Sequence, residues 1–163
     1  MTFLRFLKVL SLGLWVGSIF FFAAAVAPGA FSVLPSHYLA GLLVSRSLAS
    51  LHWLGVLCGL VFLLCSLLIA LFEGGPTPFH KSDLLIVVMI GITLLTHYTV
   101  EKKMLRLRES MGVIDTIAHD DPRRVEFNRL HKYSTGMEES VFVCGLVLMY
   151  MRAKADGENR RFY

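Results

Sequence analysis

The chain has 163 residues, of which 55% are hydrophobic, and its mean hydropathy is +0.63. This apolar excess, gathered in long uncharged runs, argues against an ordinary soluble domain and predicts an integral membrane protein. The net charge of +4 indicates contact with anionic lipid headgroups rather than nucleic acid, because the basic residues lie between the apolar runs with acids among them.

The first predicted transmembrane helix spans residues 9–31, which follow the basic residues Arg5 and Lys8. About 20 apolar residues are enough to cross a bilayer. This start also has the pattern of a secretory signal peptide, with small residues at 25–27 as a cleavage site. Pro28 would follow the cut, where proline is poorly tolerated. We therefore predict a retained helix that ends or kinks near Pro28.

A second apolar run, residues 47–72, follows a predicted loop at 32–46 and is the clearest transmembrane signal in the chain. It carries His52 near its start. Small residues four apart let helix backbones approach closely in a membrane. Two such pairs predict helix-packing faces: Gly13 with Gly17 in the first helix, and Gly55 with Gly59 in the second.

The third predicted helix crosses the membrane at residues 84–100, with Ser82 or Asp83 as its N-cap. Good helix formers continue the pattern to about Ser110. Because basic residues follow position 100, this continuation is expected to leave the hydrocarbon.

The fourth predicted helix starts at Asp121-Pro122, where an N-cap residue precedes proline at the first helical position. Its first third is too charged for lipid, so only residues 133–151 are expected in the membrane, and Glu138 must enter with them. We expect residues 152–163 to form a polar surface tail.

These elements predict an all-α, four-helix transmembrane bundle whose third and fourth helices extend beyond the membrane as a hairpin. Residues 1–163 would form one integral membrane domain. Basic residues are nearly balanced between the two faces, and the basic N-terminus and tail place both termini in the cytoplasm. A bacterial inner membrane is the expected location.

Four spans bring the start of the second helix, the end of the third and the start of the fourth to one membrane surface. An ionisable residue inside a membrane is a functional hypothesis by default. On the fourth helix, His131, Ser134 and Glu138 share one face. The candidate metal ligands are His52, His97, Glu101, His131 and Glu138, with Ser134 and Thr93 in support. Alternatively, these groups bind carbonyls, headgroups or one another. No comparable set is expected at the other end of the bundle.

Histidine and carboxylate ligands suit a borderline divalent metal, whereas Cu(I) prefers cysteine and methionine. The predicted function is to bind or pass a metal ion or a proton. One alternative is an accessory subunit of a larger respiratory or photosynthetic membrane complex, docked through the glycine faces. Another is a b-type haem protein with axial ligands among His52, His97 and His131. No hydrolase or nucleotide-binding motif is present, which favours a non-enzymatic role.

Several short stretches are similar to a known family. They are LWVGSIFFF at 14–22, AP at 27–28, FSVLP at 31–35 with Gly41 following, and FNRLHKYS at 127–134. In their order the chain resembles the transmembrane-protein-205-like family of small four-helix membrane proteins. The resemblance implies that Leu130, His131 and Ser134 open the last span. Glu138 stands where the family often has asparagine, which implies proton or cation binding in place of hydrogen bonding. Soft-metal handling and kinship with copper-resistance membrane proteins are further implications.

Overall fold

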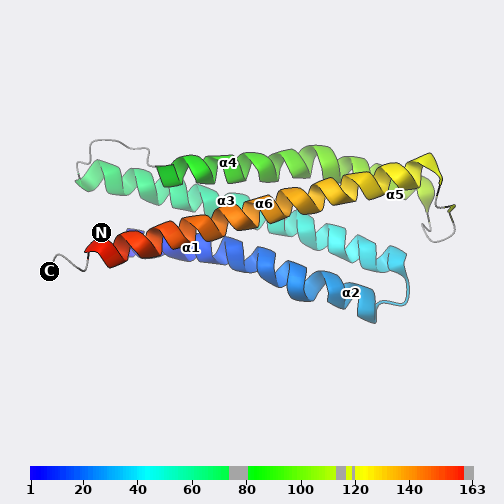
Figure 1. The fold of residues 1–163 in the computed structure, drawn as a ribbon, viewed down its shortest axis with the longest axis horizontal. Coiled ribbons are helices and arrows are strands. Elements are labelled where there is room, and N and C mark those ends of the chain that lie inside the picture. Colours follow the sequence, from blue (N-terminus) through cyan, green and yellow to red (C-terminus); the bar gives the residue numbers. More distant parts are fainter. Residues whose placement is uncertain (74–80, 113–116, 119, 160–163) are drawn as a thin grey trace.

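Four long helices run side by side in the computed structural model, which describes residues 1–73, 81–112, 117–118 and 120–159 (Figure 1). Consecutive helices are antiparallel, so the start of the first helix and the end of the last lie at the same end of the bundle. The described residues contain no strand. The predicted all-α four-helix bundle is confirmed.

The first helix is longer than predicted. It comprises α1 (Thr2–Phe21), the π-helical turn η1 (Phe22–Val26) and α2 (Ala27–Val33) without a break. Pro28 does not end it but lies in the first turn of α2. Proline lacks an N–H and clashes with the carbonyl four residues earlier, and the wide turn of η1 directly before it accommodates both defects.

The second helix, α3 (His37–Glu73), begins ten residues before the predicted start at 47. The Oγ of Ser36 accepts a hydrogen bond from the N–H of Leu39 at 3.2 Å, which satisfies an otherwise unpaired donor of the first turn. The predicted loop at 32–46 is therefore wrong, since α2 ends at Val33 and α3 starts four residues later. As a result His52 lies fifteen positions into the helix, about 22 Å from its start.

The third helix comprises α4 (Lys81–Leu95), a second π-helical turn η2 (Thr96–Glu101) and α5 (Lys102–Met111). It continues to Met111, as the helix formers after position 100 predict. Gly112, with φ +63°, ends it and donates its N–H to the carbonyl of Arg108 at 3.0 Å. Because the helix already includes Lys81, neither Ser82 nor Asp83 is its N-cap, and Asp83 is instead buried in the bundle.

The fourth helix, α6 (Pro122–Asn159), begins where the sequence predicts. The Oδ1 of Asp121 accepts the N–H of Arg123 at 2.8 Å, which confirms Asp121 as the N-cap residue. The helix extends to Asn159, so most of the predicted tail at 152–163 is helical. Residues 160–163 of that tail lie outside the described residues.

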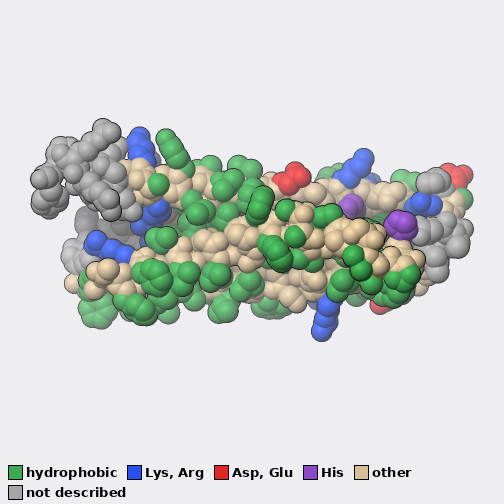
Figure 2. Space-filling view, turned by 90° about the horizontal axis from the view of Figure 1, so that it is seen from below, with side chains coloured by type: hydrophobic (Ala, Val, Ile, Leu, Met, Phe, Trp, Pro, Cys, Tyr) green, Lys and Arg blue, Asp and Glu red, His purple; other side chains and the backbone are tan. Residues whose placement is uncertain are grey.

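Three of the four long helices are long and apolar enough to cross a membrane, judged by length and composition among the described residues: Thr2–Val33, His37–Phe72 and Lys81–Met111. α6 is not among them, yet Val141 and Leu148 on α6 are buried in the core. Figure 2 shows hydrophobic side chains over much of the visible surface, with most Lys and Arg toward its two ends. Exposed leucines and phenylalanines along α1 and α3 would be unfavourable in water and suit lipid.

The core is built around Trp15, whose side chain is only 2% exposed. A Cβ placed on Gly55 would lie 2.3 Å from Trp15 Nε1, and one on Gly59 would lie 3.0 Å from the same ring. α1 and α3 can therefore approach closely only because both positions lack a side chain. Nothing lies within 4 Å of a Cβ at Gly13 or Gly17, and both glycines line an open groove between α1 and α3.

Candidate functional site

His52 of α3 is at the centre of a polar cluster inside the bundle, with a side chain only 3% exposed. Its Nε2 contacts the Oε1 of Glu138 on α6. Its Nδ1 lies 3.3 Å from Oε1 of Glu101 on η2. The imidazole thus lies between carboxylates from two other helices.

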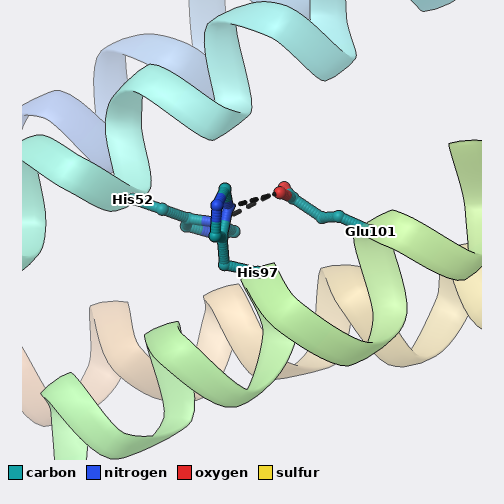
Figure 3. Close-up of side chains that lie close together, drawn as sticks. All are labelled: His52, His97 and Glu101. Carbon is teal, nitrogen blue, oxygen red and sulfur yellow. Dashed lines mark hydrogen bonds and ion pairs between the residues drawn. The ribbon is translucent and has the colours of Figure 1, made fainter.

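His97 and Glu101 reach the cluster from η2, where they lie four residues apart. His97 Nδ1 is 2.8 Å from Glu101 Oε2. The His97 ring meets the ring of His52 edge to face, with centroids 5.7 Å apart. Figure 3 shows His52, His97 and Glu101 pointing toward one another across the gap between the two helices. π-helical turns are rare and often occur at functional sites.

Two atoms of this cluster are buried without a hydrogen-bond partner: Nδ1 of His52 and Oε1 of Glu101. Buried polar atoms are nearly always paired. If His52 donates its Nε2 proton to Glu138, its Nδ1 carries a lone pair that faces a carboxylate oxygen 3.3 Å away. Two electron-rich atoms in such contact are stabilised by a cation between them.

The donor set fits a metal ion. His52, His97 and Glu101 each offer one ligand atom, and these three atoms all lie within 4.8 Å of one another. Three nitrogen and oxygen ligands with one open position are typical of zinc sites that bind a further ligand. Glu138 would then be the carboxylate that binds the other ring nitrogen of a ligating histidine and fixes its tautomer.

The other predicted site residues lie at the edge of this cluster or on its helices. Ser134 is buried, and His131 is exposed two turns from Glu138 on α6; both line a cavity that His97, Glu101 and Glu138 also line. The Thr93 hydroxyl is buried and donates to the carbonyl of Met89 at 2.9 Å. The structure therefore brings together His52, His97, Glu101 and Glu138 and leaves His131 and Thr93 outside their contacts.

The geometry does not support the haem alternative for His52 and His97. Axial ligands bind opposite faces of the porphyrin, whereas these two rings contact each other directly, with centroids 5.7 Å apart. His131, the third candidate axial ligand, is exposed on α6.

A second buried polar cluster lies at the other end of the bundle, where none was expected. Lys8 Nζ of α1 is 3.4 Å from Asp83 Oδ1 of α4, and the Ser66 hydroxyl of α3 donates to the same oxygen at 2.6 Å. The expectation of no comparable set there is wrong. The sequence contained a signal: Lys8 lies four and seven residues before Leu12 and Trp15, on the buried face of the first helix.

The three cysteines form no disulfide bond. Cys58, Cys65 and Cys144 are all free thiols, and the first two are buried in the bundle. This agrees with their interpretation as packing residues.

Together the fold and the cluster define a small α-helical protein of membrane type with a buried histidine and glutamate site. Residues 10–112 match the family model described as Domain of unknown function (DUF4149). Since this segment is more than half of the chain, the protein belongs to that family. The match contains His52, His97 and Glu101 but ends before α6 and so excludes Glu138. No curated protein and no solved structure matches the chain significantly.

Proposed function

We propose that the protein binds a divalent metal ion of borderline hardness, such as Zn²⁺, within the membrane. The ligands are His52, His97 and Glu101, and Glu138 orients His52 from α6. The observation that supports this most strongly is the contact between His52 Nδ1 and Glu101 Oε1, two buried atoms 3.3 Å apart that have no hydrogen-bond partner. Ligand atoms about 2.1 Å from a tetrahedral ion are separated by a similar distance, about 3.4 Å.

The charges of the cluster also favour a divalent cation. Glu101 and Glu138 carry two negative charges when ionised, and an isolated charge inside a membrane is costly. A divalent ion with two neutral histidines makes the site electrically neutral. Imidazole and carboxylate ligands select a borderline ion over Cu(I), which prefers sulfur.

Metal titration of the purified protein tests this proposal. In detergent, with Co²⁺ as a spectroscopic substitute for Zn²⁺, we expect one ion per chain and visible absorption bands of a low-coordinate site. His52→Ala and Glu101→Gln should each abolish binding. Affinity should fall in acid, because histidine must be deprotonated to bind a metal.

His131→Ala is the matched control, because His131 is on the same cavity but outside the cluster. It should bind Co²⁺ like the wild-type protein. Binding that survives His52→Ala, or that His131→Ala weakens equally, would contradict the proposed ligand set. If no metal ion binds to the folded wild-type protein, the result indicates that the cluster binds a proton instead.

The finer topology is part of the same proposal. We infer four spans, with α6 as the fourth, both termini in the cytoplasm of a bacterial inner membrane, and a relationship to the transmembrane-protein-205-like family. The placement of the beginning of α1 and the end of α6 at one end of the bundle supports this arrangement (Figure 1). Cysteine labelling of both ends in intact and opened cells tests it. Labels that reach the two ends from opposite sides would contradict four spans.

An accessory role in a larger membrane complex is the second proposal. It is supported by Gly13 and Gly17, which line an open groove between α1 and α3 with space beside them. Native mass spectrometry in mild detergent tests it, since the proposal requires a mass larger than one chain.

A further inference from the structure

Arg108 is a buried cation for which the described residues provide no counter-charge. It lies on α5, three residues before the helix ends, and its side chain is mostly enclosed, with the residue 8% exposed. Its Nη1 donates to the carbonyl of Gly41 at 2.6 Å and to the hydroxyl of Ser45 at 2.8 Å. Both acceptors are uncharged, and among the described residues no carboxylate forms an ion pair with Arg108. Arginine is rarely buried unless an anion accompanies it.

The guanidinium group keeps part of its hydrogen-bonding capacity. It has five N–H donors, and the two on Nη1 have protein acceptors, which leaves those on Nη2 and Nε. A Cβ on Gly41 would lie 2.9 Å from Nη2, so the group is seated against the backbone of α3. The ring of Phe127 lies 5.3 Å from its central carbon. The remaining donors form the planar fork that suits a phosphate or carboxylate.

Arg108 lines a cavity of about 760 Å³ between the first helix, α3, η2, α5 and α6. The cavity extends along α6 from Phe127 to Phe142, fifteen positions or about 22 Å of helix. Its walls are largely apolar and include Phe20, Phe31, Leu42, Leu48, Leu105 and Phe142. The cavity is longer than the depth of one leaflet, about 15 Å. Its apolar side chains come mainly from the first helix and α3, while α6 contributes the polar residues His131, Ser134, Glu138 and Glu139.

The other charged residues on the wall are of both signs. Glu101 and Glu138 contact His52, and Glu139 lines the cavity from an exposed position on α6. Lys102 and Arg46 also line the cavity and add positive charge near it. The end of α5 is rich in basic residues, as expected where a helix leaves the hydrocarbon and meets lipid headgroups.

We propose that this cavity binds an anionic amphiphile, a molecule with a phosphate or carboxylate headgroup on a long hydrocarbon chain. The headgroup binds the free N–H groups of Arg108, and the chain lies along the apolar wall toward Phe142. An anionic phospholipid and a free fatty acid share this chemistry. The headgroup end of this site is separate from the proposed metal ligands, because Arg108 lies two turns of helix beyond Glu101, although His97, Glu101 and Glu138 line the same cavity farther along.

Lipid titration by native mass spectrometry tests the proposal. Delipidated protein in a neutral detergent is mixed with phosphatidylglycerol, with phosphatidylcholine of the same chains, or with palmitate. We expect one anionic molecule per chain, bound at least tenfold more tightly than phosphatidylcholine. The preferred one of the two anions identifies the source of the headgroup.

Arg108→Gln should weaken binding of the anion at least tenfold. Arg106→Gln is the matched control, because Arg106 is exposed on the same helix and does not line the cavity. Equal binding of phosphatidylcholine by the wild-type protein, or equal weakening by the two variants, would overturn the proposal. If Arg108→Gln does not fold, Arg108→Lys is the second variant, because it keeps the charge and should still discriminate against phosphatidylcholine. Folded Arg108→Lys protein that binds phosphatidylcholine as tightly as the anion would also overturn the proposal.

Discussion

The buried pair of Lys8 and Asp83 allows a sharp test of how the bundle is held together. The two side chains are 9% and 2% exposed, and 3.4 Å separates Nζ from Oδ1. Lys8 Nζ also lies 4.4 Å from the centre of the Phe62 ring, and the Ser66 hydroxyl donates to the carboxylate. Asp83→Asn preserves shape and an acceptor for Ser66 but removes the negative charge.

The expected cost of Asp83→Asn is about 3–5 kcal/mol of unfolding free energy, because it leaves a buried ammonium without its counter-ion. The interaction of Lys8 with the Phe62 ring offsets only part of this loss, about 1–2 kcal/mol. The double variant Lys8→Met with Asp83→Asn removes both charges, and replacing a whole buried pair is often neutral or stabilising. We therefore expect the double variant to lie within about 1 kcal/mol of wild type and to be more stable than Asp83→Asn alone.

Unfolding by sodium dodecyl sulfate in mixed micelles measures these differences, with the fluorescence of the two tryptophans, Trp15 and Trp53, as the probe. Lys103→Met is the matched control. Its Nζ is closer to a carboxylate, 2.5 Å from Glu126, but the two side chains are 54% and 32% exposed. Solvent screens such a pair, so we expect little change. The argument that burial makes this ion pair important would be refuted in two cases. The double variant could be as unstable as Asp83→Asn, or Lys103→Met could lower the unfolding free energy as much as Asp83→Asn does.

Three further substitutions test local packing and capping. Gly55→Ala should destabilise the protein by about 1–3 kcal/mol, because the added Cβ would lie 2.3 Å from Trp15 Nε1. Gly17→Ala, with open space, should be neutral or stabilising by up to about 1 kcal/mol, and the reverse order in the same unfolding assay would contradict this packing. Hydrogen bonds from the side chain and backbone of Arg123 lower the pKa of Asp121 from 3.8 to about 2. The cap therefore stabilises fully above pH 3.8 and is lost as the pH falls through about 2. Asp121→Ala should speed amide exchange in the first turn of α6 at neutral pH, and unchanged exchange would refute the cap.

Hydrophobic runs and turn residues predict most of the fold. The Asp121-Pro122 signal gives the start of α6 to the residue, because an N-cap carboxylate followed by proline has a local physical cause. The start of α3 is missed by ten residues. Residues 37–46 contain serine, histidine and arginine and were interpreted as a loop, whereas helix packing and the Ser36 cap favour the helix.

The candidate site is predicted in part. Counting spans brings His52, His97, Glu101 and Glu138 to one end, and the structure places them together. Periodicity on α6 also put His131 on the same face, but helix spacing cannot tell which of two residues seven positions apart is closer to a partner helix. In the sequence, Arg108 is one of several basic residues after position 100 that predict an exit from the membrane. Its burial depends on Gly41, which lies 67 positions away.

The wide turn η2 also determines the direction in which the side chains after it point around the helix axis. Each residue of an α-helix rotates the chain by about 100°, and a π turn shifts that phase relative to an uninterrupted helix. His97 and Glu101 lie within the shifted turn and Arg108 lies beyond it. If Thr96–Glu101 were wound as a regular helix one residue shorter, Met89 and Thr93 would keep their place in the core while Arg108 would rotate away from α3. One irregular turn thus sets how α5 is rotated about the helix axis relative to α4.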